Sequence, residues 1–287
     1  MNLSPPSASR KPEVHGHRGC RGLLPENTLP AFLHALALGV DVLELDVVIS
    51  ADQQVVISHE PWLNPLICRG PAGESLLPST SPEFNLYRMP YATIRQCDCG
   101  QLRHPDFPLQ APQPAVKPLL REVLAAVEAA TRQLGRSPVR YSIEVKSLPE
   151  GDGYFHPAPD VFLPLVLAEI QAAAVSPRTT LLCFDPRVLR LAVRLQPSLT
   201  TCLLVEEEQP WLDSLQALGL VPTTFGPNQY TVSAEAIAAL HAVYPGLRIV
   251  PWTVNDTADM LRLIRLGVDG ITTDYPDRLI ECLQHHV

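Results

Sequence analysis

Two acidic residues, two positions apart, lie in a strongly apolar stretch of the sequence. The run from Val42 to Ile49 reads VLELDVVI, which predicts a buried β-strand. Side chains alternate between the faces of a strand, so Glu44 and Asp46 point to the same side. Two like charges on a buried face are costly unless a cation or hydrogen-bond donors meet them. The pair therefore indicates a divalent metal site, with an exposed edge strand as the alternative.

A second predicted strand, Val139–Lys146, repeats this pattern. Glu144 and Lys146 share one of its faces, opposite two apolar residues. Three carboxylates from two strands are an oxygen-ligand set of the kind that Mg²⁺ or Ca²⁺ prefers. Zinc fits less well, because it usually takes His or Cys ligands.

The overall composition narrows the class of partner. The chain has 287 residues, of which 46% are hydrophobic, and 22 basic against 30 acidic residues give a net charge of −8. This field is unfavourable for nucleic acid or an anionic membrane surface, and an anionic substrate would need a local positive site. No run approaches the roughly 20 apolar residues of a membrane-spanning helix. Residues 1–13 lack the apolar segment of a secretion signal, which predicts a cytoplasmic protein unless a leader has been removed.

The seven cysteines are odd in number and scattered, as expected of reduced thiols. The pair Cys97-Asp98-Cys99 is too close, without a second pair, to indicate a zinc site, and we interpret it as part of a loop. Nothing in the sequence indicates an oligomeric state.

The remaining chain alternates between predicted strands and helices. Residues 1–12 are predicted to be a flexible tail. Predicted strands begin near residues 13, 42, 139, 179, 199, 222, 247 and 269, and a helical pattern follows each of them. Eight such units predict a TIM (β/α)₈ barrel that forms a single domain over residues 1–287. The active site of such a barrel lies in the loops after the strands.

One segment interrupts this alternation. After the second strand, a short hairpin arm returns the chain through Val55 to His59. Residues 60–118 then hold 11 of the 30 prolines and keep neither a helical nor a strand period. Long irregular segments in compact domains are usually lids or binding loops, so we predict that residues 60–117 form a cap inserted over one end of the barrel.

Chemically reactive residues collect where the predicted strands end, as a barrel active site requires. They are His17, Arg18, Glu44, Asp46, Glu144, Lys146, Trp252, Asn255, Thr273 and Asp274. Several also have structural interpretations. His17 could be a buried histidine bonded to backbone, Arg18 a surface ion pair and His59 a solvent-facing hairpin residue. Lys146 could serve merely to neutralise the charge of Glu144, and Trp252 could serve merely as a packing residue.

The ordered motifs resemble those of the glycerophosphodiester phosphodiesterase family from about His15 to the C-terminus. They are His17-Arg18-Gly19, Pro25-Glu26-Asn27-Thr28, Glu44-Leu45-Asp46-Val47, Val55-Val56-Ile57 with His59, Glu144-Val145-Lys146, Trp252-Thr253-Val254-Asn255, and the run from Gly267 to Pro276. The chain departs from the family pattern at two places. Glu60 follows the second histidine where the family commonly has Asp, and Gln53 stands where the family tends to place glycine.

The resemblance implies a TIM barrel that hydrolyses glycerophosphodiesters to sn-glycerol 3-phosphate and an alcohol. It implies a divalent cation held by Glu44, Asp46 and Glu144, and two catalytic histidines, His17 and His59. It also implies that the proline-rich segment is the family's cap, which shapes the site for the alcohol.

For this chemistry we expect Arg18 and Lys146 to contact the phosphate and Trp252 to contact the substrate. The two imidazoles would act as an acid/base pair, and the sequence does not decide which is the base. It also leaves open whether water or a substrate hydroxyl attacks first. The alternatives are a related, phospholipase D-like barrel phosphodiesterase acting on lysophospholipids or sphingolipids, with or without a cyclic phosphate, and a non-catalytic phosphodiester-binding barrel.

Overall fold

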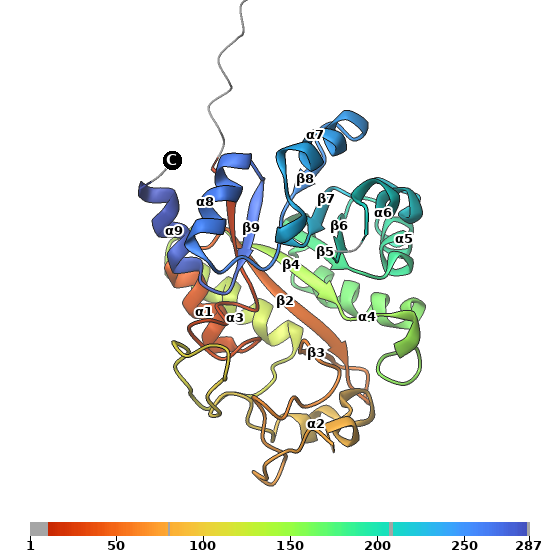
Figure 1. Cartoon of the computed structure of the whole chain (residues 1–287). Helices are drawn as coiled ribbons and strands as arrows, with labels where there is room; N and C mark the ends of the chain where they lie inside the picture. The colour runs from red at the N-terminus through yellow and green to blue at the C-terminus, as the bar shows by residue number, and fades with distance from the viewer. Residues whose placement is uncertain (1–10, 80, 207–208, 286–287) are drawn as a thin grey trace, which may run out of the picture.

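The computed structural model describes residues 11–79, 81–206 and 209–285, and its centre is one sheet (Figure 1). In spatial order, the main strands of this sheet are β8, β7, β6, β5, β4, β2, β1 and β9, all paired in parallel, and β3 pairs with β2 in antiparallel. The strands are β1 Glu13–Gly16, β2 Val42–Ile49, β3 Val55–Ile57, β4 Arg140–Val145, β5 Thr179–Cys183, β6 Thr200–Val205, β7 Thr224–Pro227, β8 Arg248–Ile249 and β9 Gly270–Thr273.

The sheet curls into a nearly closed barrel. The strands at the two ends of this order, β8 and β9, approach each other, and backbone hydrogen bonds join the chain there. Asp269 N–H donates to Ile249 O at 2.9 Å, and Thr272 N–H donates to Pro251 O at 3.0 Å. The predicted (β/α)₈ fold is therefore confirmed. All eight predicted barrel strands are present, and their bounds differ from the predicted ones by a few residues at most.

Helices connect the parallel strands on the outside of the barrel (Figure 1). The α-helices are α1 Leu29–Leu38, α2 Tyr91–Ile94, α3 Leu120–Gln133, α4 Pro159–Ala172, α5 Pro186–Leu195, α6 Trp211–Leu218, α7 Ala234–Val243, α8 Thr257–Leu266 and α9 Pro276–His285. Short 3₁₀ turns are found at Ser81–Phe84, Leu86–Arg88, Pro149–Gly151, Ser176–Arg178 and Gln229–Thr231. Local signals explain the bounds of α1, because Thr28 caps its N-terminus by accepting from Ala31 N–H and Gly39 ends it at φ 109°.

Strand β2 shows how the barrel separates its two faces. Leu43, Leu45 and Val47 pack outward into the main apolar core together with the helices. Glu44 and Asp46 alternate with them and therefore point to the barrel interior. All eight residues of β2 are buried, so the alternative of an exposed edge strand is wrong.

The segment between β3 and α3 lies past the end of β3, away from most of the barrel helices (Figure 1, orange to yellow). It has an apolar cluster of its own that includes residues of β2, β3 and α2. The buried members are Val48, Val56, Leu63, Ile67, Cys68, Leu76, Leu86, Met89, Tyr91, Ile94, Cys97, Cys99 and Leu119. The segment is thus packed rather than loose, and its role as a cap stays a prediction.

One sequence prediction needs correction, and another lies mostly outside the described residues. Of the predicted flexible tail, residues 1–12, only Lys11 and Pro12 are described: Pro12 is buried, and Lys11 donates to Leu283 O at 2.8 Å. The prediction of reduced thiols is wrong for Cys68 and Cys99, which form a disulfide. The sequence missed it because the two partners are 31 residues apart in an irregular segment. The cytoplasmic location stays a prediction.

Within the described ranges, each helix is too short or too polar to span a bilayer.

Candidate active site

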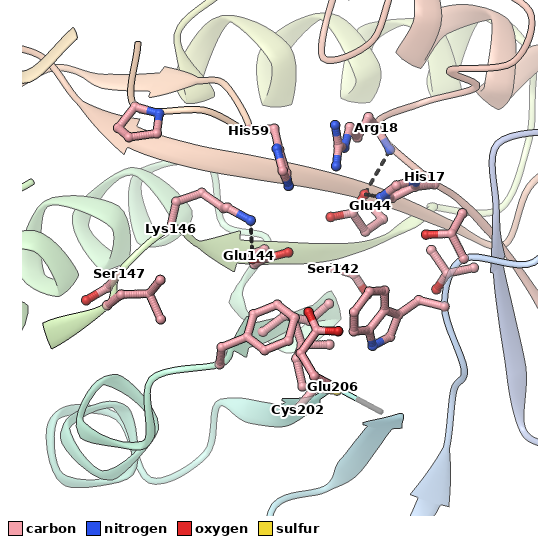
Figure 2. Close-up of a pocket in the computed structure, with 18 of the residues that line it drawn as sticks. His17, Arg18, Glu44, His59, Ser142, Glu144, Lys146, Ser147, Cys202 and Glu206 are labelled. Atoms are coloured by element: carbon pink, nitrogen blue, oxygen red, sulfur yellow. Dashed lines mark hydrogen bonds and ion pairs between the residues drawn. The ribbon is translucent and has the colours of Figure 1, made fainter. Parts of the chain in front are cut away.

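Three carboxylates from two neighbouring strands meet inside the barrel mouth. Asp46 of β2 lies opposite Glu144 of β4 in the sheet register, and Glu44 lies two residues before Asp46 on the same face. One ligand oxygen from each of the three lies within 4.8 Å of the others. All three residues are buried, and Figure 2 shows Glu44 and Glu144 facing the same pocket.

Nearby donors hold these carboxylates in place. Arg18 N–H donates to Glu44 at 2.8 Å, and the Asn27 amide donates to Oδ2 of Asp46 at 2.8 Å. Lys146 Nζ donates to Glu144 at 2.6 Å, the contact marked in Figure 2, and lies 3.7 Å from Oδ1 of Asp46. Lys146 therefore does neutralise Glu144, as the structural interpretation expected, and it also lines the pocket.

The charges of the cluster are not balanced by these donors alone. Burial and the neighbouring charges of Asp46 and Glu144 raise the pKa of Glu44 well above its usual value. Burial also raises the pKa of Glu144, even though Lys146 opposes it. Burial alone would raise the pKa of Asp46 too, but Arg18, His59 and Lys146 lower it further than burial raises it.

The residues present fit a hard divalent cation. Oδ1 of Asp46 is buried and has no hydrogen-bond partner among the described residues, so an acceptor oxygen is left unused at the centre of the cluster. The donor set consists of carboxylate oxygens, which suits Mg²⁺ or Ca²⁺. No His or Cys belongs to this set, which disfavours zinc.

The imidazole of His17 lies beside this cluster, in the loop after β1. Its Nδ1 is 2.7 Å from Oδ1 of Asp274, and its Nε2 is 3.9 Å from Oε2 of Glu44. Burial, helped by the charges of Arg18 and Arg21, lowers the pKa of His17 to about 4, although Asp274 opposes this change. The side chain is neither exposed nor bonded to backbone through the ring nitrogens.

The second imidazole comes from the hairpin arm. His59 follows β3 and lines the same cavity as Glu44 and Glu144, and Figure 2 shows it pointing into the pocket. Its Nδ1 is 3.1 Å from Oε1 of Glu60, and the side chain is 32% exposed. Each of the two imidazoles thus has a carboxylate at Nδ1. The alternative, a hairpin residue facing solvent, does not describe this geometry, because His59 lines the pocket.

The side chains expected to contact the substrate all line the same cavity. The guanidinium of Arg18 is buried, 2.9 Å from Glu26 and 3.3 Å from Asp46, so it is not a surface ion pair. The indole N–H of Trp252 donates to Gly226 O at 2.8 Å, and its ring packs edge-on against Phe184 at 5.4 Å. Trp252 therefore both packs and faces the cavity.

The cavity has a volume of about 790 Å³ and two unlike walls. The charged wall includes Glu44 and Glu144 of the cluster, the imidazoles and the basic side chains described above. We call the large apolar lining residues the apolar wall; they are Trp62, Leu148, Phe155, Leu182, Phe184, Leu204, Val250 and Trp252. A pocket of this size accommodates a small organic ligand with one charged and one apolar part.

Some residues of the site were not singled out from the sequence. Glu26 and Asn27 were part of the motif Pro25-Glu26-Asn27-Thr28 and had no predicted role, yet Glu26 pairs with Arg18 and Asn27 holds Asp46. Their polar run before an apolar helix was the available signal. Trp62 and Phe155 had no signal, because each lies in an irregular segment without periodicity.

Comparison with known proteins gives one consistent result. The model of the Glycerophosphoryl diester phosphodiesterase family matches residues 17–278. A glycerophosphodiester phosphodiesterase of Bacillus altitudinis is 28% identical over 273 residues, which cover 94% of this chain and 97% of that protein. The human protein named lysophospholipase D GDPD1 is 54% identical over 44 residues, which cover 15% of this chain and 14% of that protein.

Solved structures show the same fold. A protein from Silicibacter pomeroyi, provisionally named a glycerophosphoryl diester phosphodiesterase, has a TM-score of 0.84 at 32% identity, covering 96% of this chain and 93% of that one. A phosphodiesterase from Oleispira antarctica, solved with the product sn-glycerol-3-phosphate, has a TM-score of 0.73 at 21% identity. The match covers 96% of this chain and 97% of that one.

Fold, site and comparisons together define a class, the barrel enzymes that hydrolyse phosphoric diesters. Within that class, the chain belongs to the glycerophosphoryl diester phosphodiesterase family.

Proposed function

We propose that this enzyme hydrolyses glycerophosphodiesters to sn-glycerol 3-phosphate and an alcohol, with His17 and His59 as its acid/base pair. The observation that carries the proposal is the placement of both imidazoles on one cavity, beside the buried cluster of Glu44, Asp46 and Glu144. The related Oleispira antarctica enzyme binds the same product, which supports a small-molecule substrate.

The cluster would hold one divalent cation, Mg²⁺ or Ca²⁺. A cation held there offsets the carboxylate charges and polarises a phosphoryl oxygen. Lys146 and Arg18 add fixed positive charge on the same wall, which favours a phosphate in a chain whose net charge is −8. Both basic groups are already engaged by carboxylates, so they lie in place before a substrate arrives.

The reaction needs one proton removed and one proton supplied. One imidazole takes the proton from the attacking oxygen, the P–O bond to the alcohol breaks, and the other imidazole protonates the departing oxygen. The attacking oxygen belongs either to water or to the neighbouring hydroxyl of the glycerol part. In the second case a cyclic phosphate forms first, and water then opens it.

The test is hydrolysis of glycerophosphocholine and glycerophosphoethanolamine, followed by ³¹P NMR. His17→Ala and His59→Ala should each lower kcat by about 10²- to 10⁴-fold. His34→Ala, in which an exposed histidine outside the site is removed, is the matched control and should leave kcat unchanged. Near-normal turnover by either site variant would refute its role, and a persistent cyclic phosphate would indicate lyase chemistry.

A second candidate substrate class is favoured by the apolar wall. Phe155 and Trp62 pack against each other at 5.2 Å on this wall, and Leu148 extends it to the surface with 54% exposure. A lysophospholipid would place its acyl chain there. The short, strongly similar stretch shared with the human lysophospholipase D is consistent with this candidate.

The two substrate classes differ in their dependence on this wall. If lysophospholipids are the preferred substrates, Phe155→Ala should lower kcat/KM for lysophosphatidylcholine by about tenfold and change it little for glycerophosphocholine. Equal losses for both substrates would exclude an acyl-chain role for the wall. The assays are run below the critical micelle concentration, so that the protein meets single lipid molecules.

A further inference from the structure

Asp274 follows β9, is fully buried and accepts four close contacts on its two carboxylate oxygens. Oδ1 is 2.7 Å from Nδ1 of His17 and 2.8 Å from Nε of Arg21. Oδ2 is 3.0 Å from a terminal nitrogen of Arg21 and 2.7 Å from Nδ2 of Asn255. The mechanism proposed above does not use Asp274.

Three of these four contacts have a fixed donor. The guanidinium of Arg21 only donates hydrogen bonds. The amide orientation of Asn255 is set by its other side, where its Oδ1 accepts from Asp274 N–H at 3.0 Å, so its Nδ2 must face the carboxylate. Burial alone would raise the pKa of Asp274, but His17 and Arg21 lower it to well below the usual value. Asp274 is therefore an ionised acceptor with no proton to give.

The fourth contact must then also come from a donor. A neutral imidazole carries its proton on one nitrogen only, and an ionised carboxylate 2.7 Å away selects the tautomer protonated at Nδ1. In that tautomer Nε2 is an acceptor. It lies on the side of the ring that faces Glu44 and the cavity, as Figure 2 shows for His17.

We propose that Asp274 is a positioning residue for the reaction: together with Arg21 and Asn255, it holds His17 with Nδ1 protonated and Nε2 presented to the substrate as the acceptor. The consequence for turnover rests on the proposed function, whereas the tautomer itself does not. Asp274 need not touch the substrate for this role.

A merely structural role for Asp274 is the competing explanation. The residue also ties two loops together, because Gly22 N–H donates to Asp274 O at 2.9 Å. A substitution could therefore lower activity by loosening the loops after β1 and β9. The tautomer of His17 separates the two roles, since a loosened loop does not by itself move a proton from one ring nitrogen to the other.

Asp274→Asn is the informative substitution, since it keeps the shape and the backbone contact. Its amide has one acceptor oxygen, which the two donors at Oδ2 would claim, so its NH₂ would face Nδ1 of His17 and leave Nε of Arg21 without its acceptor. The imidazole must then accept there and carry its proton on Nε2, where it blocks the acceptor. Asp256→Asn is the matched control, because it makes the same change at an exposed helix cap beside the network.

The experiment combines ¹⁵N NMR of histidine-labelled full-length protein with steady-state kinetics on glycerophosphocholine. We expect His17 to be protonated at Nδ1 in the wild type and at Nε2 in Asp274→Asn. We also expect kcat to fall by about 10²- to 10⁴-fold, with KM changed by less than about threefold. Asp256→Asn should match the wild type in both measurements.

Two results would overturn the proposal: a wild-type His17 protonated at Nε2, or an Asp274→Asn enzyme whose kcat stays within about threefold of the wild type. If Asp274→Asn does not fold, the wild-type spectrum still decides the tautomer. Asn255→Ala, which keeps the carboxylate, should then keep the Nδ1-protonated form. If the wild type shows no phosphodiesterase activity, the proposed function is wrong. The NMR spectra still show whether Asp274 sets the tautomer of His17, because that measurement does not depend on activity.

Discussion

Asn27 holds Asp46 through both ends of its side-chain amide. Its Nδ2 donates to Oδ2 of Asp46 at 2.8 Å, and its Oδ1 accepts from Asp46 N–H at 3.4 Å. Asn27 is 2% exposed and has a φ of 55°, in the left-handed region that Asn and Gly tolerate best. Because Oδ2 is engaged in this way, Oδ1 of Asp46 is left for the proposed cation.

The first prediction follows from this contact. Asn27→Gly keeps the backbone conformation and removes only the amide, so we expect it to weaken cation binding and to lower the free energy of unfolding by about 1–3 kcal/mol. Asn27→Ala should cost about 1 kcal/mol more, because alanine is strained at this φ. Urea unfolding and calorimetric titration with Mg²⁺ and Ca²⁺ measure the two effects. Equal stability of Asn27→Gly and the wild type would show that the contact contributes nothing.

The second prediction concerns removal of the metal. A chelator should abolish hydrolysis, and Mg²⁺ or Ca²⁺ should restore it. An added cation should also raise the Tm of the wild type, since it binds only the folded cluster. Glu44→Gln should lose this Tm increase, whereas Glu281→Gln, at an exposed position of α9, should keep it. Full activity in the presence of chelator would contradict a metal role for Glu44, Asp46 and Glu144.

The third prediction is a pH dependence of stability that comes from Glu60. Burial alone would raise the pKa of Glu60, but the hydrogen bond with His59 and the charge of Lys117 lower it to about 2. An acid whose pKa is lower in the folded state stabilises the fold above its unfolded pKa, near 4.5, and loses that contribution as the pH falls toward 2.

Glu60→Gln removes this titration. We therefore expect the wild type to lose more free energy of unfolding than Glu60→Gln on acidification from about pH 5 to pH 3, by an amount on the order of 2 kcal/mol. Urea unfolding at several pH values measures it. Glu281→Gln is the control and should follow the wild type. Parallel curves for the wild type and Glu60→Gln would count against the described environment of Glu60.

The fourth prediction concerns the hairpin turn before β3. Gln53 has a φ of 58°, where a side chain is strained, and it is exposed. Gln53→Gly should raise the free energy of unfolding by about 0.5–1 kcal/mol and leave kcat unchanged. Gln54→Gly is the matched control, because Gln54 has no positive φ and accepts a hydrogen bond from Arg121 at 2.6 Å. Gln54→Gly should lower the free energy of unfolding. If Gln53→Gly lowers it as well, the turn at Gln53 is not strained.

Much of the architecture was predictable because its signals are local. The helical pattern predicted after the strand near residue 247 corresponds to α8, whose ends are marked by an Asp at the N-cap and a glycine after the last turn. The segment over residues 60–117 could be recognised but not described. Its apolar residues follow no period, and its disulfide joins Cys68 to Cys99 across the irregular chain.

The sequence by itself determined which side chains share a face, because strand alternation follows from covalent geometry. It placed Glu44 beside Asp46 and Glu144 beside Lys146. Only the tertiary structure decided what the imidazole of His17 meets, whereas His59 meets the carboxylate of the next residue, Glu60. His17 and Asp274 are 257 residues apart, and they lie 2.7 Å apart because β9 pairs with β1 in one particular register. That register depends on how the barrel as a whole packs, and no local pattern encodes it.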